Sequence, residues 1–591
     1  MPPRKRPTPR SVDPVLVALG ALHAALVLWA LWAWIEGPFG GEGVLDGAEV
    51  LRLAREGSSG TFETKSPLVP ALLGALFALL GDSPWTVGAL GLAASLATLA
   101  AVVGLTREVE PAPRAVRTAA ALYALSGSAL VFAVQPLPTL TATALLAWGT
   151  LLLSRACRSG TGPSAVAAGA LLAAASFARA PLALAALAAL ACAARAAPRS
   201  ALRAGGAALA VALVAFAVWG ARAWPGGAAF NLRLGNGSER SGLCDVRPGP
   251  DYDRLRLEAA FAEVDARGAP PEFEAFHARA LLREVRDDPR GALQTLVRKA
   301  VLFLHRTETV SAADFRHGLA RMPIAPLLLA SFGLVMPLAL CGLLLRPRWE
   351  LLAPFVAVLA ANVLFMTCAR YRFPALPFAC AAAGVLVVTQ LEVAGIGGFL
   401  LLLIGLNKAP SGATLLVPGD GLVQQARLAL TRDRAAPEVR ALYETAFEAG
   451  SLDPRAHYEL ALALEASGAS HDVERALEHY ATALELAPDY AEAAENRVAL
   501  LLRAGRVAQA RALCEARPPE LAHAARMDLN LAGLERAAGH EARALELERR
   551  GFTTLALRAL AGGDPAQASR WAREAAMRGA HDPRTAFLLA R

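Results

Sequence analysis

The amino-acid sequence predicts an all-α protein, in which a polytopic bundle of membrane helices precedes a soluble helical-repeat domain. Hydrophobic residues make up 55% of the 591 positions, and the long apolar runs crowd into residues 15–407. The basic residues of this part gather in short clusters between the runs. From residue 408 onward the chain is charged, rich in alanine and leucine, and periodic. A membrane domain followed by a soluble domain explains all three observations.

The apolar runs set the expected number of membrane crossings. Each is about 14 to 23 residues long, which suits a hydrocarbon core about 30 Å thick. Residues 1–14 are basic, and the first run lacks a small-residue cleavage site, so we expect a cytoplasmic N-terminus and a retained anchor. The sequence predicts about eleven crossings, at residues 15–35, 84–105, 117–134, 138–154, 164–178, 181–196, 205–222, 323–345, 351–368, 373–390 and 394–407.

One further apolar stretch, residues 67–81, is ambiguous, and the basic clusters decide its assignment. If it lies along the membrane surface, the later clusters fall on the same side as the basic N-terminus, as the positive-inside rule requires. If it crosses, all of them lie outside. We therefore predict an interfacial helix, outer loops at 36–83 and 223–322, and an extracytoplasmic C-terminal domain. The clusters are Arg107, Arg114 and Arg117; Arg155 and Arg158; Arg195, Arg199 and Arg203; and Arg346 and Arg348.

A linker at 408–435 leads to a repeat domain at 436–591. Ala476, Ala510 and Ala544 recur with a 34-residue period, and Gly505 recurs as Gly539. The pattern resembles tetratricopeptide (TPR) repeats, in which a glycine ends the first helix and a small residue follows where the second helix packs closely. Generic antiparallel helices are the alternative. Either arrangement offers a concave surface to a protein partner.

The first outer loop holds the candidate catalytic acids. Asp46 follows the first span closely, and an acid at the mouth of a membrane bundle is costly unless it is solvated or used. On a helix, Glu49 would share a face with Asp46. Lys65 precedes a predicted helix start, where free amides and a cation suit a phosphate. The alternatives are a solvated loop acid for Asp46 and a snorkelling interfacial lysine for Lys65.

Three arginines lie in predicted outer turns, against the positive-inside rule. Arg179 lies in a very short outer turn, and Arg370 and Arg372 lie in another. Binding to an anionic lipid phosphate would explain them, since a guanidinium pairs with phosphate through two hydrogen bonds. Ordinary headgroup contact is the alternative.

The order of these features resembles the polyprenyl-phosphate-sugar-dependent glycosyltransferases of the GT-C fold, which include the protein O-mannosyltransferases and the lipid A aminoarabinose transferases. The resemblance rests on Asp46 after the first span, followed by KSPLVPALL at 65–73 and FALLG at 77–81. Similar stretches follow at 219–224, 231–237, 298–308 and 370–377.

The resemblance implies transfer of a sugar from a polyprenyl-phosphate carrier to a lipid, glycan or protein acceptor at the outer face of a bacterial inner membrane. Asp46 would orient or deprotonate the acceptor, with Glu49 as a second candidate. The residues implied for the lipid phosphate are Lys65, Arg179, Arg370 and Arg372. The expected partners are the sugar donor, membrane lipids and a protein on the repeat domain, without nucleic acid. No cofactor or metal ligand is expected, and a divalent metal ion stays open.

Two alternatives to this enzyme remain. One is a catalytically silent membrane anchor or transporter that presents the repeats as a scaffold. The other is a GT-C-like glycan polymerase or ligase with its functional residues in the loop 223–322. Two positions differ from many members of the family that this sequence resembles. Gly47 stands where an acid often follows the first aspartate, and the outer loop 134–139 has no acid where a second one is common. The sequence therefore favours a mechanism with one carboxylate.

Overall fold

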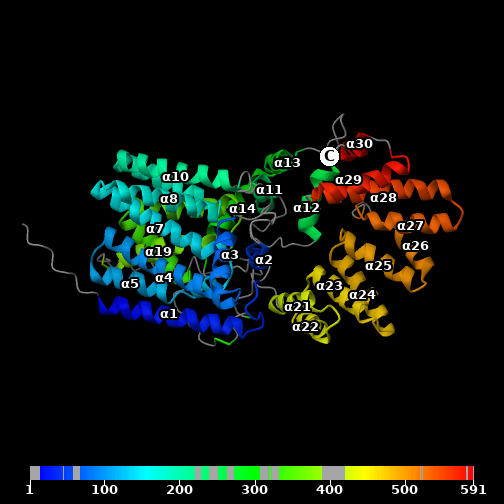
Figure 1. Ribbon diagram of the computed structural model, residues 1–591, viewed down its shortest axis with the longest axis horizontal. Coiled ribbons are helices and arrows are strands. Elements are labelled where there is room, and N and C mark those ends of the chain that lie inside the picture. The colour runs from blue at the N-terminus through cyan, green and yellow to red at the C-terminus, as the bar shows by residue number, and fades with distance from the viewer. Residues whose placement is uncertain are drawn as a thin grey trace, which may run out of the picture. The chain divides into compact units, whose positions relative to one another are not determined.

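The computed structural model is almost entirely helical (Figure 1). Of the described residues, 84% are helical and none lies in a strand. The chain forms two compact units: unit 1 comprises 1–227, 234–244 and 288–415, and unit 2 comprises 228–233, 245–287 and 416–591. The described residues are 13–43, 46–56, 67–219, 228–237, 250–262, 272–305, 317, 321–322, 332–388, 419–518, 521, 523–562, 564–580 and 583–589.

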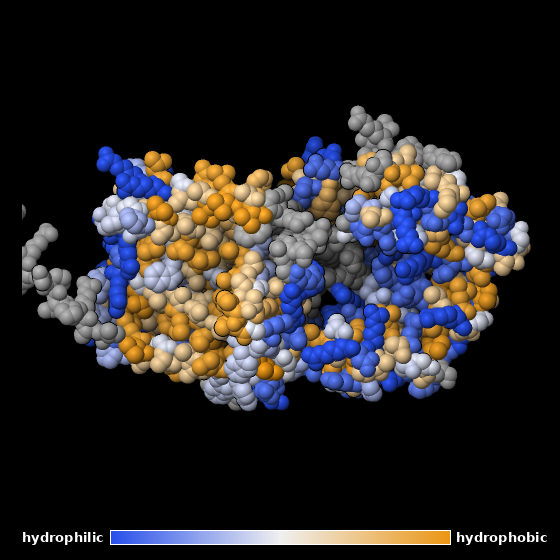
Figure 2. Space-filling view, in the orientation of Figure 1, coloured by the Kyte–Doolittle hydropathy of each residue, from blue (hydrophilic) through white to orange (hydrophobic). Residues whose placement is uncertain are grey.

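Unit 1 is a bundle of mainly apolar helices. Their surface is predominantly hydrophobic, as expected for helices that face lipid (Figure 2). The helices are α1 (Pro14–Ile35), α2 (Asp46–Glu56), α3 (Leu68–Leu80), α4 (Pro84–Val109), α5 (Pro113–Ala124), α6 (Gly127–Val134), α7 (Pro138–Ser159), α8 (Gly162–Ala178), α9 (Leu182–Ala196), α10 (Pro198–Trp219), α14 (Pro289–Leu304), α16 (Phe332–Leu345), α17 (Trp349–Leu364), α18 (Ala369–Arg372), η4 (Phe373–Ala375) and α19 (Leu376–Val388), while α11 (Ala228–Asn236) lies at the boundary between the units.

Five helices in the described part are long and apolar enough to cross a membrane: α1, α4, α7, α10 and the continuous α18 to α19 segment. The pair α5 and α6, bent by 51°, would make a sixth. The expected count of about eleven is therefore not confirmed. Helices α8, α9, α16 and α17 coincide with expected crossings but have 17 residues or fewer. The expected crossing at 394–407 and the start of the one at 323–345 lie outside the described residues.

Contacts between α1 and α4 indicate whether the chain crosses the bundle in the stretch 67–81. The two helices run antiparallel, with His23 Nε2 bonded to Ser95 Oγ at 2.7 Å near their centres. After the end of α1, a Cβ atom at Gly41 would lie 2.8 Å from the side chain of Pro84, the first residue of α4. The chain thus leaves and rejoins the bundle at the same end. Helices α2 and α3 do not carry it across, which agrees with the predicted non-crossing helix.

Unit 2 is built from consecutive helices that each contact the next. Gly468, Gly505 and Gly539 end helices with positive φ angles of 67°, 72° and 84°, which glycine adopts without steric cost. The periodic alanines Ala476, Ala510 and Ala544 are fully buried. The helices are α12 (Pro250–Phe261), α13 (Phe273–Asp287), α21 (Asp420–Arg432), α22 (Pro437–Glu448), α23 (Pro454–Ser467), α24 (Ser470–Leu486), α25 (Ala491–Arg503), α26 (Val507–Glu515), α27 (Ala525–Ala537), α28 (Glu541–Ala561), α29 (Pro565–Met577) and α30 (Pro583–Leu589).

The loop between the membrane helices also contributes to unit 2. Helix α12 packs on α28. Phe261 at its end lies against a buried apolar cluster of Ala556, Leu557, Ala572 and Leu588. Its ring centroid is 6.2 Å from that of His523. Part of the predicted outer loop 223–322 is therefore packed into the C-terminal domain.

Close packing in unit 1 predicts a difference between two glycines. A Cβ atom at Gly169 of α8 would lie 1.9 Å from the Ala204 carbonyl oxygen of α10, whereas a Cβ at Gly205 would meet nothing within 4 Å. We expect Gly169→Ala to destabilise the bundle by about 1–3 kcal/mol, since the backbones must separate. Gly205→Ala should stabilise it by up to about 1 kcal/mol. Apparent melting temperatures in one detergent check this, and equal values for the two variants would contradict it.

Candidate functional site

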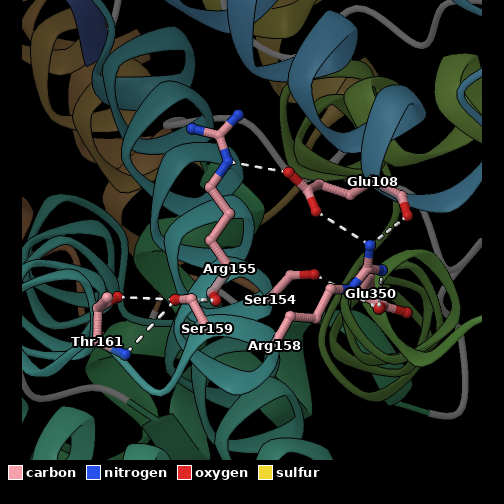
Figure 3. Close-up of polar contacts among 7 residues, drawn as sticks. All are labelled: Glu108, Ser154, Arg155, Arg158, Ser159, Thr161 and Glu350. Atoms are coloured by element: carbon pink, nitrogen blue, oxygen red, sulfur yellow. Dashed lines mark hydrogen bonds and ion pairs between the residues drawn. The ribbon is translucent and has the colours of Figure 1, made fainter. Parts of the chain in front are cut away.

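Ion pairs tie helix ends together at one end of unit 1. Arg155 Nε lies 3.0 Å from Glu108 Oε1, and Arg158 bridges Glu108 at 3.0 Å and Glu350 at 2.9 Å (Figure 3). These contacts join the last turns of α4 and α7 to the first turn of α17. Glu350 is almost fully buried, so Arg158 compensates a carboxylate that is shielded from water.

Further ion pairs extend this end of the bundle. Arg117 Nε lies 3.0 Å from Asp13 Oδ2, and Arg346 Nη1 lies 2.6 Å from Glu110 Oε2. Three of the basic clusters used for the topology therefore contribute to one end, called the basic end below. Their meeting in space is what the positive-inside rule requires if the helices cross a membrane.

The opposite end of α7 leads to the predicted catalytic acid. Asp46 begins α2, where a carboxylate is favoured by the partial positive charge of a helix N-terminus. It forms an ion pair with Arg370 of the short helix α18. Only 28% of the Asp46 side chain and 12% of the Arg370 side chain are exposed, so water screens this pair less than a surface pair. The structure thus joins two of the predicted site residues.

Arg179, from the turn between α8 and α9, joins the same group. Its Nη1 donates to Thr139 Oγ1 at 3.0 Å and to the carbonyl oxygen of Arg370. Its guanidinium carbon lies 4.5 Å from the ring centroid of Tyr371, and that of Arg370 lies 5.0 Å from the same ring. We call Asp46, Thr139, Arg179, Arg370 and Tyr371 the Asp46 site. Within the described residues, the site brings two guanidinium groups and one carboxylate together, and guanidinium groups suit an anion such as a phosphate.

Of the predicted site residues Glu49 and Lys65, the structure describes only Glu49. Glu49 pairs with Arg52 on the surface of α2, with Glu49 Oε1 2.7 Å from Arg52 Nη2. Its carboxylate is therefore engaged outside the Asp46 site. Lys65, the predicted phosphate ligand, lies outside the described residues.

Arg372 is two residues from Arg370 but has another environment. It is buried, and its Nη1 donates to the carbonyl oxygens of Leu302, Phe303 and His305 at 3.1, 3.3 and 2.6 Å. These carbonyls belong to the last turn of α14 and to the residue that follows it, where helical partners are lacking. The structure thus places Arg372 at the end of α14, and its binding of a lipid phosphate stays a prediction.

Lys299 is a second buried cation, and the sequence did not predict it. Lys299 of α14 is fully buried, and its Nζ donates to Asn236 Oδ1 at 2.7 Å and to the Phe365 carbonyl oxygen at 2.9 Å. The Asn236 amide in turn donates to the Leu364 carbonyl oxygen at 2.7 Å. Burial lowers the pKa of Lys299 to about 7. No spacing in the sequence signals this role, because Lys299 and its two partners come from three separate segments.

Unit 2 has a cavity of its own. It encloses about 660 Å³ and is lined by α23, α25, α27, α28 and α29. Within it, Arg558 bonds Glu495 at 2.8 Å. The charged and aromatic lining residues are Arg434, Tyr458, Glu492, Glu495, Arg526, Arg558, Asp564 and Trp571.

The lowered pKa of Lys299 predicts a pH dependence. Between pH 7 and the ordinary value of 10.5, the unfolded chain holds a proton that the folded protein has released. The contribution of Lys299 to the free energy of unfolding therefore rises with pH across this window. We expect the melting temperature of the wild type minus that of Lys299→Met to increase from pH 7 to pH 10. A difference that is independent of pH would contradict the assignment.

Comparisons with known proteins add no family. No protein-family model matches the chain, and no curated protein matches it significantly.

Proposed function

We propose that unit 1 is a membrane glycosyltransferase that transfers a sugar from a polyprenyl-phosphate carrier to an acceptor hydroxyl at the outer face of a bacterial inner membrane. The observation that carries the proposal is the Asp46 site, in which a carboxylate adjoins two guanidinium groups at the end of the bundle opposite the basic end. The order of motifs that resembles the GT-C enzymes gives independent support.

The two arginines would bind the phosphate of the donor. As the bond between the anomeric carbon and the phosphate oxygen breaks, negative charge grows on the phosphate, and preorganised cations stabilise it. Arg179 is held by Thr139 and by the Arg370 backbone, and Tyr371 lies beside both guanidinium groups. Such fixed donors need little reorganisation during the reaction. Electrostatic stabilisation of the leaving group is the main catalytic effect that we propose.

Asp46 would act on the acceptor. Without donor, its carboxylate pairs with Arg370. A donor phosphate would compete for this guanidinium and leave Asp46 to accept the proton of the acceptor hydroxyl. The acceptor oxygen then bonds to the anomeric carbon, the phosphate departs as an anion, and the configuration inverts. A single carboxylate suffices for this step, and the pairing of Glu49 with Arg52 favours Asp46 over Glu49.

Contacts in unit 2 support the predicted side of the C-terminal domain. Because α12 packs on α28, residues 250–262 and the C-terminal domain must lie on the same side of a membrane. The chain between them then crosses an even number of times. The described part supplies α16, α17 and the segment α18 to α19. A crossing by the apolar sequence 394–407 makes the number even, in agreement with the arrangement of about eleven spans.

We further propose that unit 2 is a TPR-like domain that binds a protein partner. Two observations support this assignment: glycines with positive φ angles end helices, and buried alanines lie at matching positions of successive helix pairs. The cavity among α23, α25 and α27 is the surface for that partner.

The enzyme proposal predicts a loss of activity on changing Asp46. We expect Asp46→Asn to lower sugar transfer about a hundredfold to ten-thousandfold, since the amide cannot accept the proton. The measurement is transfer from radiolabelled polyprenyl-phosphate sugars to membrane acceptors by purified protein. Asp82→Asn is the matched control, because Asp82 pairs with Arg55 at 2.8 Å outside the Asp46 site. It should retain transfer.

Equal transfer by the wild type and Asp46→Asn would refute the role of Asp46. If the wild type itself transfers no sugar, and deletion of residues 430–591 abolishes the cellular function while Asp46→Asn does not, the protein is instead a membrane anchor for the repeats. Loss of transfer only on changes within 223–322 would indicate the polymerase or ligase.

The even number of crossings between residues 250–262 and the C-terminal domain predicts how reporter proteins fused to the chain will behave. Alkaline phosphatase fused after residue 591 should be active, and green fluorescent protein fused there should be dark, because the C-terminus is extracytoplasmic. The same reporters fused after Ala197, in the loop that carries Arg195 and Arg199, should give the reverse result. A fluorescent C-terminal fusion would overturn the proposed topology.

A further inference from the structure

A buried carboxamide without a partner lies in the turn that joins α6 to α7. Gln135 is 6% exposed, and both its Nε2 and its Oε1 are buried without a hydrogen bond. Among the described residues, no other side chain has two such atoms. A buried donor and acceptor that are left unpaired lower the stability of the fold. We therefore expect them to have a role other than stabilisation.

Contacts on both sides of Gln135 place it beside the Asp46 site. Pro136 lies against Gly47, the neighbour of Asp46, since a Cβ atom at Gly47 would be 3.2 Å from Pro136 Cγ. On the other side, the ring centroid of Phe132 is 4.8 Å from that of Phe373, which directly follows α18. The turn that carries Gln135 is thus packed between α2 and the segment that holds Arg370.

The surroundings also limit what Gln135 could bind. The charged groups of the site already account for a phosphate and a proton acceptor. A carboxamide is neutral, and it presents a donor and an acceptor side by side. Neighbouring hydroxyl groups of a sugar ring offer the complementary acceptor and donor. A site that hydrogen-bonds a hydroxyl discriminates strongly against a substrate that lacks it, because its own polar group is then left unpaired.

We propose that the carboxamide of Gln135 binds ring hydroxyl groups of the transferred sugar and so determines which sugar is accepted. This inference rests on the proposed function, and it assigns Gln135 to specificity and not to proton transfer. In the absence of sugar, its two polar atoms are unpaired. With sugar bound, both gain partners.

The test uses Gln135→Met, which keeps the length of the side chain and removes both polar atoms. Full-length protein is assayed with a polyprenyl-phosphate hexose and with its singly deoxygenated analogues, one for each ring hydroxyl. We expect kcat/KM for the parent donor to fall about tenfold to a hundredfold. Discrimination against one or two of the analogues should disappear. The melting temperature should stay equal or rise, because an unpaired buried amide has been removed.

Ser126→Ala is the matched control, since Ser126 Oγ is also buried without a partner but lies at the bend between α5 and α6. It should keep both the rate and the discrimination. Gln135→Glu provides a second variant that keeps an acceptor and loses the donor. It should retain discrimination only for a hydroxyl that donates to residue 135.

The outcomes separate the two proposals. If the wild type transfers sugar and Gln135→Met matches it in rate and discrimination, the assignment of Gln135 is overturned while the enzyme stands. A lower melting temperature with unchanged discrimination would likewise overturn it, since the amide would then be structural. If the wild type neither binds nor transfers any donor, the proposed function itself fails.

Discussion

In the described part of unit 1, charged side chains lie at or near the ends of the apolar helices, and the organisation of the protein depends on this constraint. A charge within a hydrocarbon environment is costly, so arginines and carboxylates collect where helices begin and end. At the basic end they neutralise one another: Glu108 accepts from both Arg155 and Arg158. At the other end Asp46 pairs with Arg370, and Arg179 is held beside this pair by Thr139 and the Arg370 carbonyl oxygen.

Helix interruptions create the Asp46 site. Helix α17 ends at Leu364, and the four-residue helix α18 follows before α19 continues the chain. The break leaves carbonyl groups without helical partners, and Lys299 and Asn236 bind those of Phe365 and Leu364. With this support, α18 presents Arg370 to Asp46 and Arg372 to the end of α14. Side chains two residues apart on so short a helix point in different directions, which explains why one arginine serves the site and the other serves the fold.

The two proposals about unit 1 share one physical basis. Polar groups kept in a poorly hydrated environment are expensive, and a protein that keeps them incompletely paired retains binding energy for a ligand. The guanidinium groups of the Asp46 site and the unpaired amide of Gln135 are poorly hydrated polar groups in neighbouring segments. One suits a phosphate and the other suits hydroxyl groups, and a lipid-phosphate sugar carries both.

The sequence by itself determined the features that depend on local pattern. Apolar length located α1, α4 and α7, charge asymmetry assigned residues 67–81 to one side of the bundle, and glycine and alanine periodicity marked the helix pairs of unit 2. Apolar length did not fix the number of spans, because helices such as α8 and α17 are too short to be assigned by length alone. The tertiary structure alone decided which charges meet. Asp46 and Arg370 are 324 residues apart, and neither the role of Arg372 nor the isolation of Gln135 has any local signal. Periodicity reports the environment of a helix face, whereas the partner of a polar group depends on how distant segments pack.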